Sequence, residues 1–142
     1  MAVVDVQGAV LGRASTNIAK RLLNGESIDV VNSEHAIVTG SRENILAHYK
    51  AKRDAGGPFK PIKGPFYPRT PHMIFKRTVR GMLPYKKPHG KKAYGNLKVH
   101  IGIPKQFKGK NIEQIGKAIE HREYLTLGDI SKLLGSNIEV KK

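Results

Sequence analysis

The sequence predicts an α/β domain built on a parallel sheet, and three observations support this fold class. The chain has 142 residues, a length that suits one compact domain over residues 1–142. Residues 3–31 read as an apolar run, a stretch with helical spacing and a second apolar run, the pattern of a right-handed βαβ unit. Hydrophobic residues make up 39% and charged residues 26%, which is enough apolar content for a folded core.

The first third of the chain contains this βαβ unit. Val3–Val6 is a short apolar run that predicts a buried strand. Apolar residues then recur at helical spacing until Asn24-Gly25, whose turn chemistry ends the helix. The run IDVV at residues 28–31 predicts the second strand, and Ala36–Val38 predicts a short third. The residues that define the helix are Leu11, Ser15, Ile18 and Leu22.

The middle of the chain predicts two helices separated by a loop. Ser41 is a candidate N-cap for the first helix. Five prolines within residues 58–71 exclude a regular helix or a central strand, so residues 54–70 are predicted to form an extended loop. Thr70-Pro71 is a typical helix start, and Pro84 ends this second helix. The apolar face of the first helix consists of Ile45, Leu46 and Tyr49.

The last part of the chain predicts a basic loop, a strand and two short helices. Residues 85–96 (YKKPHGKKAYGN) are interpreted as a basic loop because Pro and Gly interrupt them. Residues 97–103 alternate apolar and other side chains, which predicts a half-buried strand. Thr126, with Asp129 three residues on, predicts the start of a short helix that Gly135 closes. A further helix is suggested by the spacing of Ile112, Ile115 and Ile119.

Charge is concentrated in one segment of the chain. The net charge is +15, yet residues 1–41 carry 3 Lys or Arg against 4 Asp or Glu, and residues 111–142 carry 5 of each. Residues 42–110 carry 18 Lys or Arg and 2 acidic residues. A surface kept basic only for solubility usually mixes both signs. This segment therefore predicts a polyanionic partner, with nucleic acid favoured over an anionic membrane surface.

The candidate binding residues lie in the predicted loop–helix–loop segment, about residues 54–96. On a helical wheel Lys76, Arg77 and Arg80 fall within about 100° of one another, opposite the apolar face. Arginine can bind phosphate with two parallel hydrogen bonds, and lysine acts as a point charge. Met82 and Leu83, at the end of this helix, are expected to pack in the core. The predicted binding residues are Lys60, Lys63, Arg69, Lys76, Arg77, Arg80, Lys86, Lys87, His89, Lys91 and Lys92.

Aromatic residues are interleaved with these cations in the proline-rich loop. Phe59, Phe66 and Tyr67 are candidates for stacking on bases. The alternative is that the rings fix the loop to the protein core, and the sequence leaves both readings open. The loops at 54–70 and 85–96 are expected to become ordered only on nucleic acid.

No motif indicates catalysis or a cofactor. The chain has no cysteine, which excludes disulfides, thiolate metal sites and cysteine nucleophiles. No two of the six histidines are three or four residues apart, so no helical metal-binding pair is expected. Gly8 and Gly12 have the position of a phosphate-binding turn but not the G-x-G-x-x-G spacing, and a tight turn is the favoured explanation. No apolar run approaches a membrane span, and the first residues lack the features of a signal peptide, so a cytoplasmic location is expected.

Four stretches of the sequence resemble one known family. Residues 74–87 read IFKRTVRGMLPYKK, which is similar to the signature of the ribosomal protein L13 (uL13) family. The start VVDVQGAVLGRASTNIAKRLLNG and the run VVNSEHAIVTG resemble the start of the same family, and TLGDISKLLG near the end resembles its archaeal and eukaryotic branch. The short length favours an archaeal source.

This resemblance implies a fold and a function. The expected fold is a three-layer α/β domain with a mostly parallel sheet of about four strands flanked by helices. The expected function is that of a structural large-subunit protein, without an active site, that binds large-subunit rRNA beside neighbouring ribosomal proteins and helps early assembly. Two alternatives stay open on the residues alone: a DNA-binding architectural protein, and a nucleotide-dependent enzyme that uses the turn at Gly8–Gly12.

Overall fold

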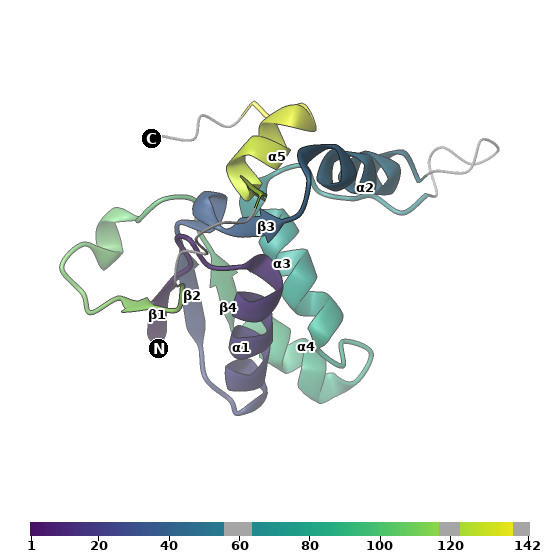
Figure 1. Cartoon of the computed structure of the whole chain (residues 1–142). Helices are drawn as coiled ribbons and strands as arrows, with labels where there is room; N and C mark the ends of the chain where they lie inside the picture. Colours follow the sequence, from purple (N-terminus) through teal and green to yellow (C-terminus); the bar gives the residue numbers. More distant parts are fainter. Residues whose placement is uncertain (56–63, 117–122, 138–142) are drawn as a thin grey trace.

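The main sheet of the domain is parallel throughout. The computed structural model describes residues 1–55, 64–116 and 123–137. Within them, β1 (Ala2–Asp5), β2 (Ile28–Val31), β4 (Leu97–Val99) and β5 (Glu113–Gln114) form a sheet of order β4-β2-β1-β5 (Figure 1). β1 pairs with β2 and β5, and β2 pairs with β4, all in parallel. The expected βαβ unit and the parallel sheet of about four strands are therefore confirmed.

The helices are divided between two locations. α1 (Leu11–Leu23), α3 (Pro71–Met82) and α4 (Pro88–Gly95) cover one face of the main sheet. α2 (Arg42–Asp54) and α5 (Leu127–Leu133) lie beyond one end of the sheet (Figure 1). Beside them β3 (Ile37–Thr39) and β6 (Tyr124–Thr126) form a separate antiparallel pair.

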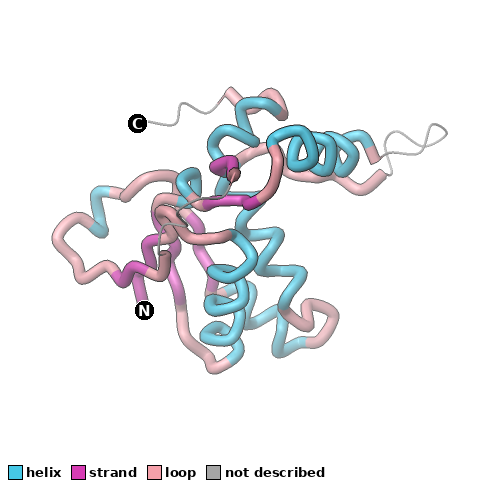
Figure 2. Tube along the Cα trace, in the orientation of Figure 1, coloured by secondary structure: helices cyan, strands magenta, loops and turns pink. Residues whose placement is uncertain are grey.

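The strand pleat separates two hydrophobic clusters and so produces three layers. Val4 and Val30 point into the main core with α1 and α3. Val3 and Val31 point the other way and pack against Phe107, which belongs to the 3₁₀ helix η2 (Lys105–Phe107). Figure 2 shows that the segment on this second face is mostly loop. The domain is thus a three-layer α/β fold in which helices form one outer layer and the η2 segment forms the other.

The helix boundaries agree closely with the sequence pattern. α1 ends at Leu23, just before Asn24-Gly25, and Gly25 adopts φ +92°. α3 begins at Pro71, with Thr70 as its N-cap residue. In α5 the backbone N–H of Asp129 donates to Thr126 Oγ1 at 3.2 Å, which is the predicted cap. These local signals determine where the helices begin and end.

The prediction that residues 85–96 form a basic loop is wrong, because most of this segment forms helix α4. Pro88 stands at the first helical position, where its missing N–H costs nothing. Gly90 is buried, and a Cβ added there would lie 2.1 Å from the Pro84 carbonyl oxygen. Pro and Gly here start a helix and allow a close approach to the chain before it. The segment is therefore folded against the core without nucleic acid, contrary to expectation.

Four further expectations need correction. The strand expected at 97–103 ends at Val99, and the backbone then bends at residues 101–102, where Gly102 adopts φ +64°. The helix expected around residues 112–119 is instead β5 where the chain is described, and Ile119 lies outside the described residues. The Ala36–Val38 strand forms as β3 but belongs to the antiparallel pair. Met82 is 39% exposed instead of buried, whereas Leu83 is buried as expected.

Candidate nucleic-acid interface

Helix α3 supplies the centre of the candidate interface. It buries Ile74, Phe75 and Val79 against the core. Arg77 and Arg80 lie on its other side, with Arg80 exposed and Arg77 half-exposed. The amphipathic pattern of the sequence therefore places these cations as predicted, on a helix that is fixed by its buried face.

Each cation on this side of α3 lies against a tyrosine ring. The guanidinium carbon of Arg77 is 4.0 Å from the ring centre of Tyr67, and that of Arg80 is 4.4 Å from the ring centre of Tyr85. Lys76 Nζ is 5.0 Å from the ring centre of Tyr94. The rings of Tyr85 and Tyr94 are themselves in edge contact, at 5.4 Å between centres. Stacking on rings orients these long side chains in advance, so that less entropy is lost when they bind an anion.

The loop before α3 exposes one aromatic ring to solvent, and a second ring of the loop packs against Arg77. Phe66 is 73% exposed, so it does not fix the loop to the core. Arg77 Nη1 donates to the Phe66 carbonyl oxygen at 3.3 Å, and the neighbouring Tyr67 lies under the Arg77 guanidinium. The two readings of the aromatic residues thus apply to different rings: Phe66 is free to stack, and Tyr67 is held in place. Phe59, the third candidate, lies outside the described residues.

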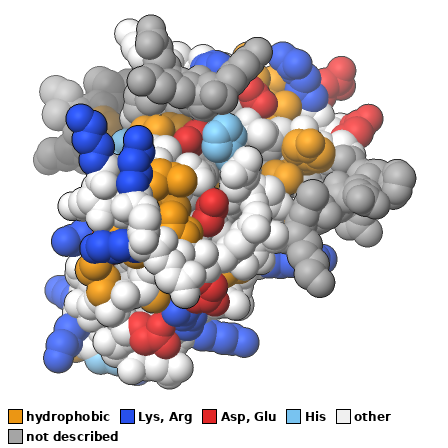
Figure 3. All heavy atoms as spheres, turned by 90° about the vertical axis from the view of Figure 1, so that its left-hand side faces the viewer, with side chains coloured by type: hydrophobic (Ala, Val, Ile, Leu, Met, Phe, Trp, Pro, Cys, Tyr) orange, Lys and Arg blue, Asp and Glu red, His pale blue; other side chains and the backbone are white. Residues whose placement is uncertain are grey.

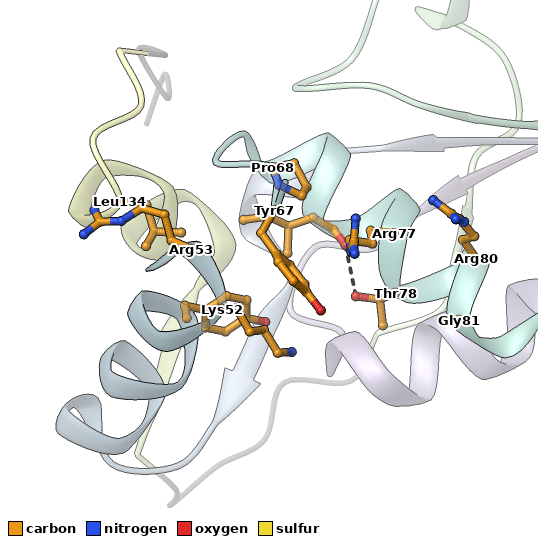
Figure 4. Close-up of a pocket in the computed structure, with 11 residues that line it drawn as sticks. Lys52, Arg53, Tyr67, Pro68, Arg77, Thr78, Arg80, Gly81 and Leu134 are labelled. Atoms are coloured by element: carbon orange, nitrogen blue, oxygen red, sulfur yellow. Dashed lines mark hydrogen bonds between the residues drawn. The ribbon is translucent and has the colours of Figure 1, made fainter. Parts of the chain in front are cut away.

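An open pocket of about 420 Å³ lies between α2 and α3 (Figure 4). Its lining includes Lys52 and Arg53, in the last turn of α2, and Arg77 and Arg80 of α3. The predicted set of binding residues omits these two α2 cations and also Tyr85 and Tyr94. The sequence does contain a signal for Lys52 and Arg53, because they stand at the end of a predicted helix, directly before the extended loop at residues 54–70. No comparable signal marked the tyrosines, since only folding brings them to α3.

The remaining predicted residues are distributed around this centre. Arg69 is exposed, and its carbonyl oxygen accepts a 2.6 Å hydrogen bond from Ser131 Oγ, which joins the loop to α5. Lys60 and Lys63 lie outside the described residues. On and just before α4 the exposed cationic candidates are Lys86, Lys87, His89, Lys91 and Lys92.

The surface on the other side of the sheet has a different charge pattern. Figure 3 shows the side of the molecule that carries η2, where acidic and basic side chains are interspersed. By contrast, none of the residues that line the α2–α3 pocket is acidic. Burial raises the pKa of Tyr49 and of Tyr94, so both phenols keep their protons at neutral pH and add no negative charge. The cations that line the α2–α3 pocket thus share this lining with no acidic side chain, in contrast to the mixed charges on the η2 side.

Comparison with known sequences then decides the family. Residues 1–106 match the sequence profile of the family described as Ribosomal protein L13. The chain belongs to the ribosomal protein L13 family.

Known relatives align with this L13-family chain over nearly its whole length. It is 46% identical to a protein of Archaeoglobus fulgidus over 138 residues, which covers 94% of this chain and 86% of the relative. A protein of Methanosphaera stadtmanae is 44% identical over 137 residues, with 94% and 96% of the two chains covered. Both relatives are named "Large ribosomal subunit protein uL13". These names are those of a ribosomal protein and not of an enzyme, as expected, and the organisms are archaeal.

Two amides of the turn at Gly8–Gly12 already bind carbonyl oxygens within the protein in this L13-family fold. Gly8 N donates to the His35 carbonyl oxygen at 3.1 Å, and Ala9 N donates to the Val6 carbonyl oxygen at 3.0 Å. Gly116 also lies against the turn, because a Cβ added to it would be 2.6 Å from Ala9 N. The favoured reading as a tight turn agrees with these contacts.

Within residues 1–55, 64–116 and 123–137, no group of three or more His, Asp or Glu side chains is placed to hold a metal ion. In the same ranges, no helix combines the length and the apolar character that crossing a membrane requires.

Proposed function

We propose that this chain is a structural component of the large ribosomal subunit and binds large-subunit rRNA through the segment at about residues 54–96. The observation that carries the proposal is the α3 surface, where three cations are stacked on three tyrosines. The names of the relatives support the large subunit as its location. The proposal places the chain on the cytoplasmic ribosome.

The mechanism is electrostatic and depends on a rigid scaffold. Folded rRNA brings phosphates close together, and cations that are fixed in position can neutralise them without further loss of entropy. Arg77 and Arg80 can donate paired hydrogen bonds to phosphate oxygens while one face of each guanidinium stays on its tyrosine. Lysines on α4 add point charges. Because A-form RNA hides its deep groove, we expect recognition of the backbone and of the shape of the RNA.

An assembly role follows from the same arrangement. A protein that joins several phosphate backbones stabilises a folded rRNA region, and such a protein helps the subunit most when it binds early. We therefore propose that the chain promotes early assembly of the large subunit. A hydrophobic core made entirely of the chain's own residues supports this proposal, because such a core needs no RNA to complete it.

The test is a sucrose-gradient profile of native lysate, with the chain detected by mass spectrometry at low and at raised salt. Co-sedimentation with the large subunit that persists at moderate salt is the expected result. Migration as a free protein, or association with DNA that DNase removes, would contradict the proposal and favour the architectural alternative. Depletion of the chain should also cause precursors of the large subunit to accumulate.

A further inference from the structure

One wall of the pocket between α2 and α3 consists of α3 residues at regular helical spacing. Ile74, Arg77, Thr78 and Gly81 are spaced at i, i+3, i+4 and i+7 along α3 and all line the pocket. Ile74 is buried and supplies an apolar floor together with Leu134, which directly follows α5. Gly81 is exposed, and a Cβ added to it would meet no atom within 4 Å. This end of the pocket is therefore open.

The opposite wall combines aromatic rings with a cation. Lys52 Nζ lies 5.5 Å from the ring centre of Tyr49 and 5.8 Å from that of Tyr67. The guanidinium carbon of Arg77 lies 4.0 Å from the ring centre of Tyr67, and both side chains line the pocket, so they offer planar groups on which a base can stack (Figure 4). Among the described residues Lys52 forms no salt bridge, whereas Arg53 is paired with Asp54 at 2.9 Å. Lys52 and Arg80 are thus available to an anion here, in addition to the stacked Arg77.

These features specify a ligand with a flat ring and a negative charge. We propose that the pocket receives a single unpaired nucleotide of rRNA, with its base against the Tyr67–Arg77 pair and its phosphate near Lys52 and Arg80. The inference rests on the proposed rRNA-binding function and adds a specific subsite to it. The volume of about 420 Å³ lies within the range that holds one small ligand. A base that stays paired in a duplex cannot enter it, so an unpaired or extruded base is required.

The proposal predicts that filling the pocket without changing charge abolishes the subsite. Gly81→Leu places a side chain at the open end of the pocket and removes no cation. Gly12→Leu is the matched control, because Gly12 is also exposed, helical and without neighbours within 4 Å, and does not line the pocket. Gly81→Gln is a second filling variant, and leucine or glutamine at a helical glycine favours the helix. Thermal melting confirms that each variant is folded.

The measurement is fluorescence anisotropy of the full chain with a labelled single-stranded RNA of about ten nucleotides, and with the same strand in a duplex. For Gly81→Leu and Gly81→Gln we expect binding of the single strand to weaken about tenfold, because one stacked base is lost, and duplex binding to stay within about twofold. Gly12→Leu should bind both RNAs like the original chain. AMP at millimolar concentration should compete only weakly, because it lacks the flanking phosphates.

The outcomes separate this inference from the proposed function. Unchanged single-strand binding by folded Gly81→Leu, with duplex binding intact, overturns the nucleotide subsite and leaves rRNA binding standing. An equal loss for single strand and duplex also overturns it, because the pocket would then not distinguish an unpaired base. Saturable binding of AMP that Gly81→Leu abolishes, without any binding of the strand, would assign the pocket to a free nucleotide and overturn the rRNA subsite. Failure of the unmodified chain to bind either RNA contradicts the proposed function itself.

Discussion

His100 Nε2 lies 3.0 Å from Asp29 Oδ1, although 71 residues separate them in the sequence. Asp29 is a buried residue of β2, and His100 follows β4, so the pair joins two neighbouring strands on the face that η2 covers. The ring of His100 also contacts that of Phe107, at 5.6 Å between centres. His100 thus links β2 to the end of β4 and also contacts η2, whose Phe107 packs on Val3 and Val31 of the sheet as well.

Loss of the Asp29 carboxylate should destabilise the fold without weakening RNA binding. Asp29→Ala leaves His100 without its partner and should lower the free energy of unfolding by about 1–3 kcal/mol. Asp29→Asn keeps a hydrogen-bonding oxygen and should cost less. Urea denaturation measures both. A larger loss for Asn than for Ala would show that the contact is not the stabilising feature.

Arg80 and Leu83 are three residues apart in the sequence but should have opposite effects. Arg80→Ala removes an exposed cation, so RNA affinity should fall by about 1–3 kcal/mol with the melting temperature nearly unchanged. Leu83→Ala creates a cavity in the core and should lower stability by about 2–5 kcal/mol. Filter binding and thermal melting distinguish the two effects. If the results were exchanged, the assignment of the two faces of α3 would be wrong.

Two glycines of α4 should respond differently to the same substitution. Gly90→Ala places a Cβ 2.1 Å from the Pro84 carbonyl oxygen, so α4 must shift, at a cost of about 1–3 kcal/mol. Gly95→Ala meets open space and should be neutral or stabilise by up to about 1 kcal/mol. Chemical denaturation of the two variants gives the comparison. Equal stability of both would mean that the close approach at Gly90 does not constrain the fold.

The affinity for rRNA should fall steeply with salt. If about 6–10 phosphates are contacted, the logarithm of the binding constant should decrease by about 0.7–0.9 per phosphate with the logarithm of salt concentration. The double variant Lys91→Ala, Lys92→Ala should make this slope shallower by the contribution of about two phosphates. Lys105→Ala, Lys108→Ala removes the same charge near η2 and serves as the control. Equal effects of the two double variants would argue against an interface centred on α3 and α4.

Stability should decrease on mild acidification partly because of His72. Burial lowers the pKa of His72 below its ordinary value of 6.5, and the positive charges of His100 and Lys76 lower it further. Protonation therefore costs more in the folded chain than in the unfolded one. The stability from this group is present above pH 6.5 and is lost as the pH falls through the folded pKa.

Denaturation at pH 8 and at about pH 5 should show a smaller loss of stability for His72→Gln than for the original chain. The other titrating groups are common to both proteins, so the difference reports on His72. A loss of stability that is the same in both would mean that His72 titrates alike in the folded and unfolded states.

The sequence alone determined the parts of this protein that depend on neighbouring residues. The apolar run, the helical spacing and the Asn24-Gly25 turn predicted β1, α1 and the parallel βαβ unit, because strand and helix periodicity are local properties. The Thr126 cap and the Pro71 start were also correct. The concentration of cations in residues 42–110 and the two faces of α3 were visible without a structure.

Only the tertiary structure decided how distant residues meet. Residues 85–96 looked like a loop because Gly90 and Pro88 are usually breakers, but burial of Ala93 and the close contact with Pro84 stabilise α4. Likewise Tyr67, Tyr85 and Tyr94 come from separate elements, and their stacking on the α3 cations follows from packing that no local pattern encodes. The α2–α3 pocket exists for the same reason: its walls are joined by the buried core and not by sequence neighbours.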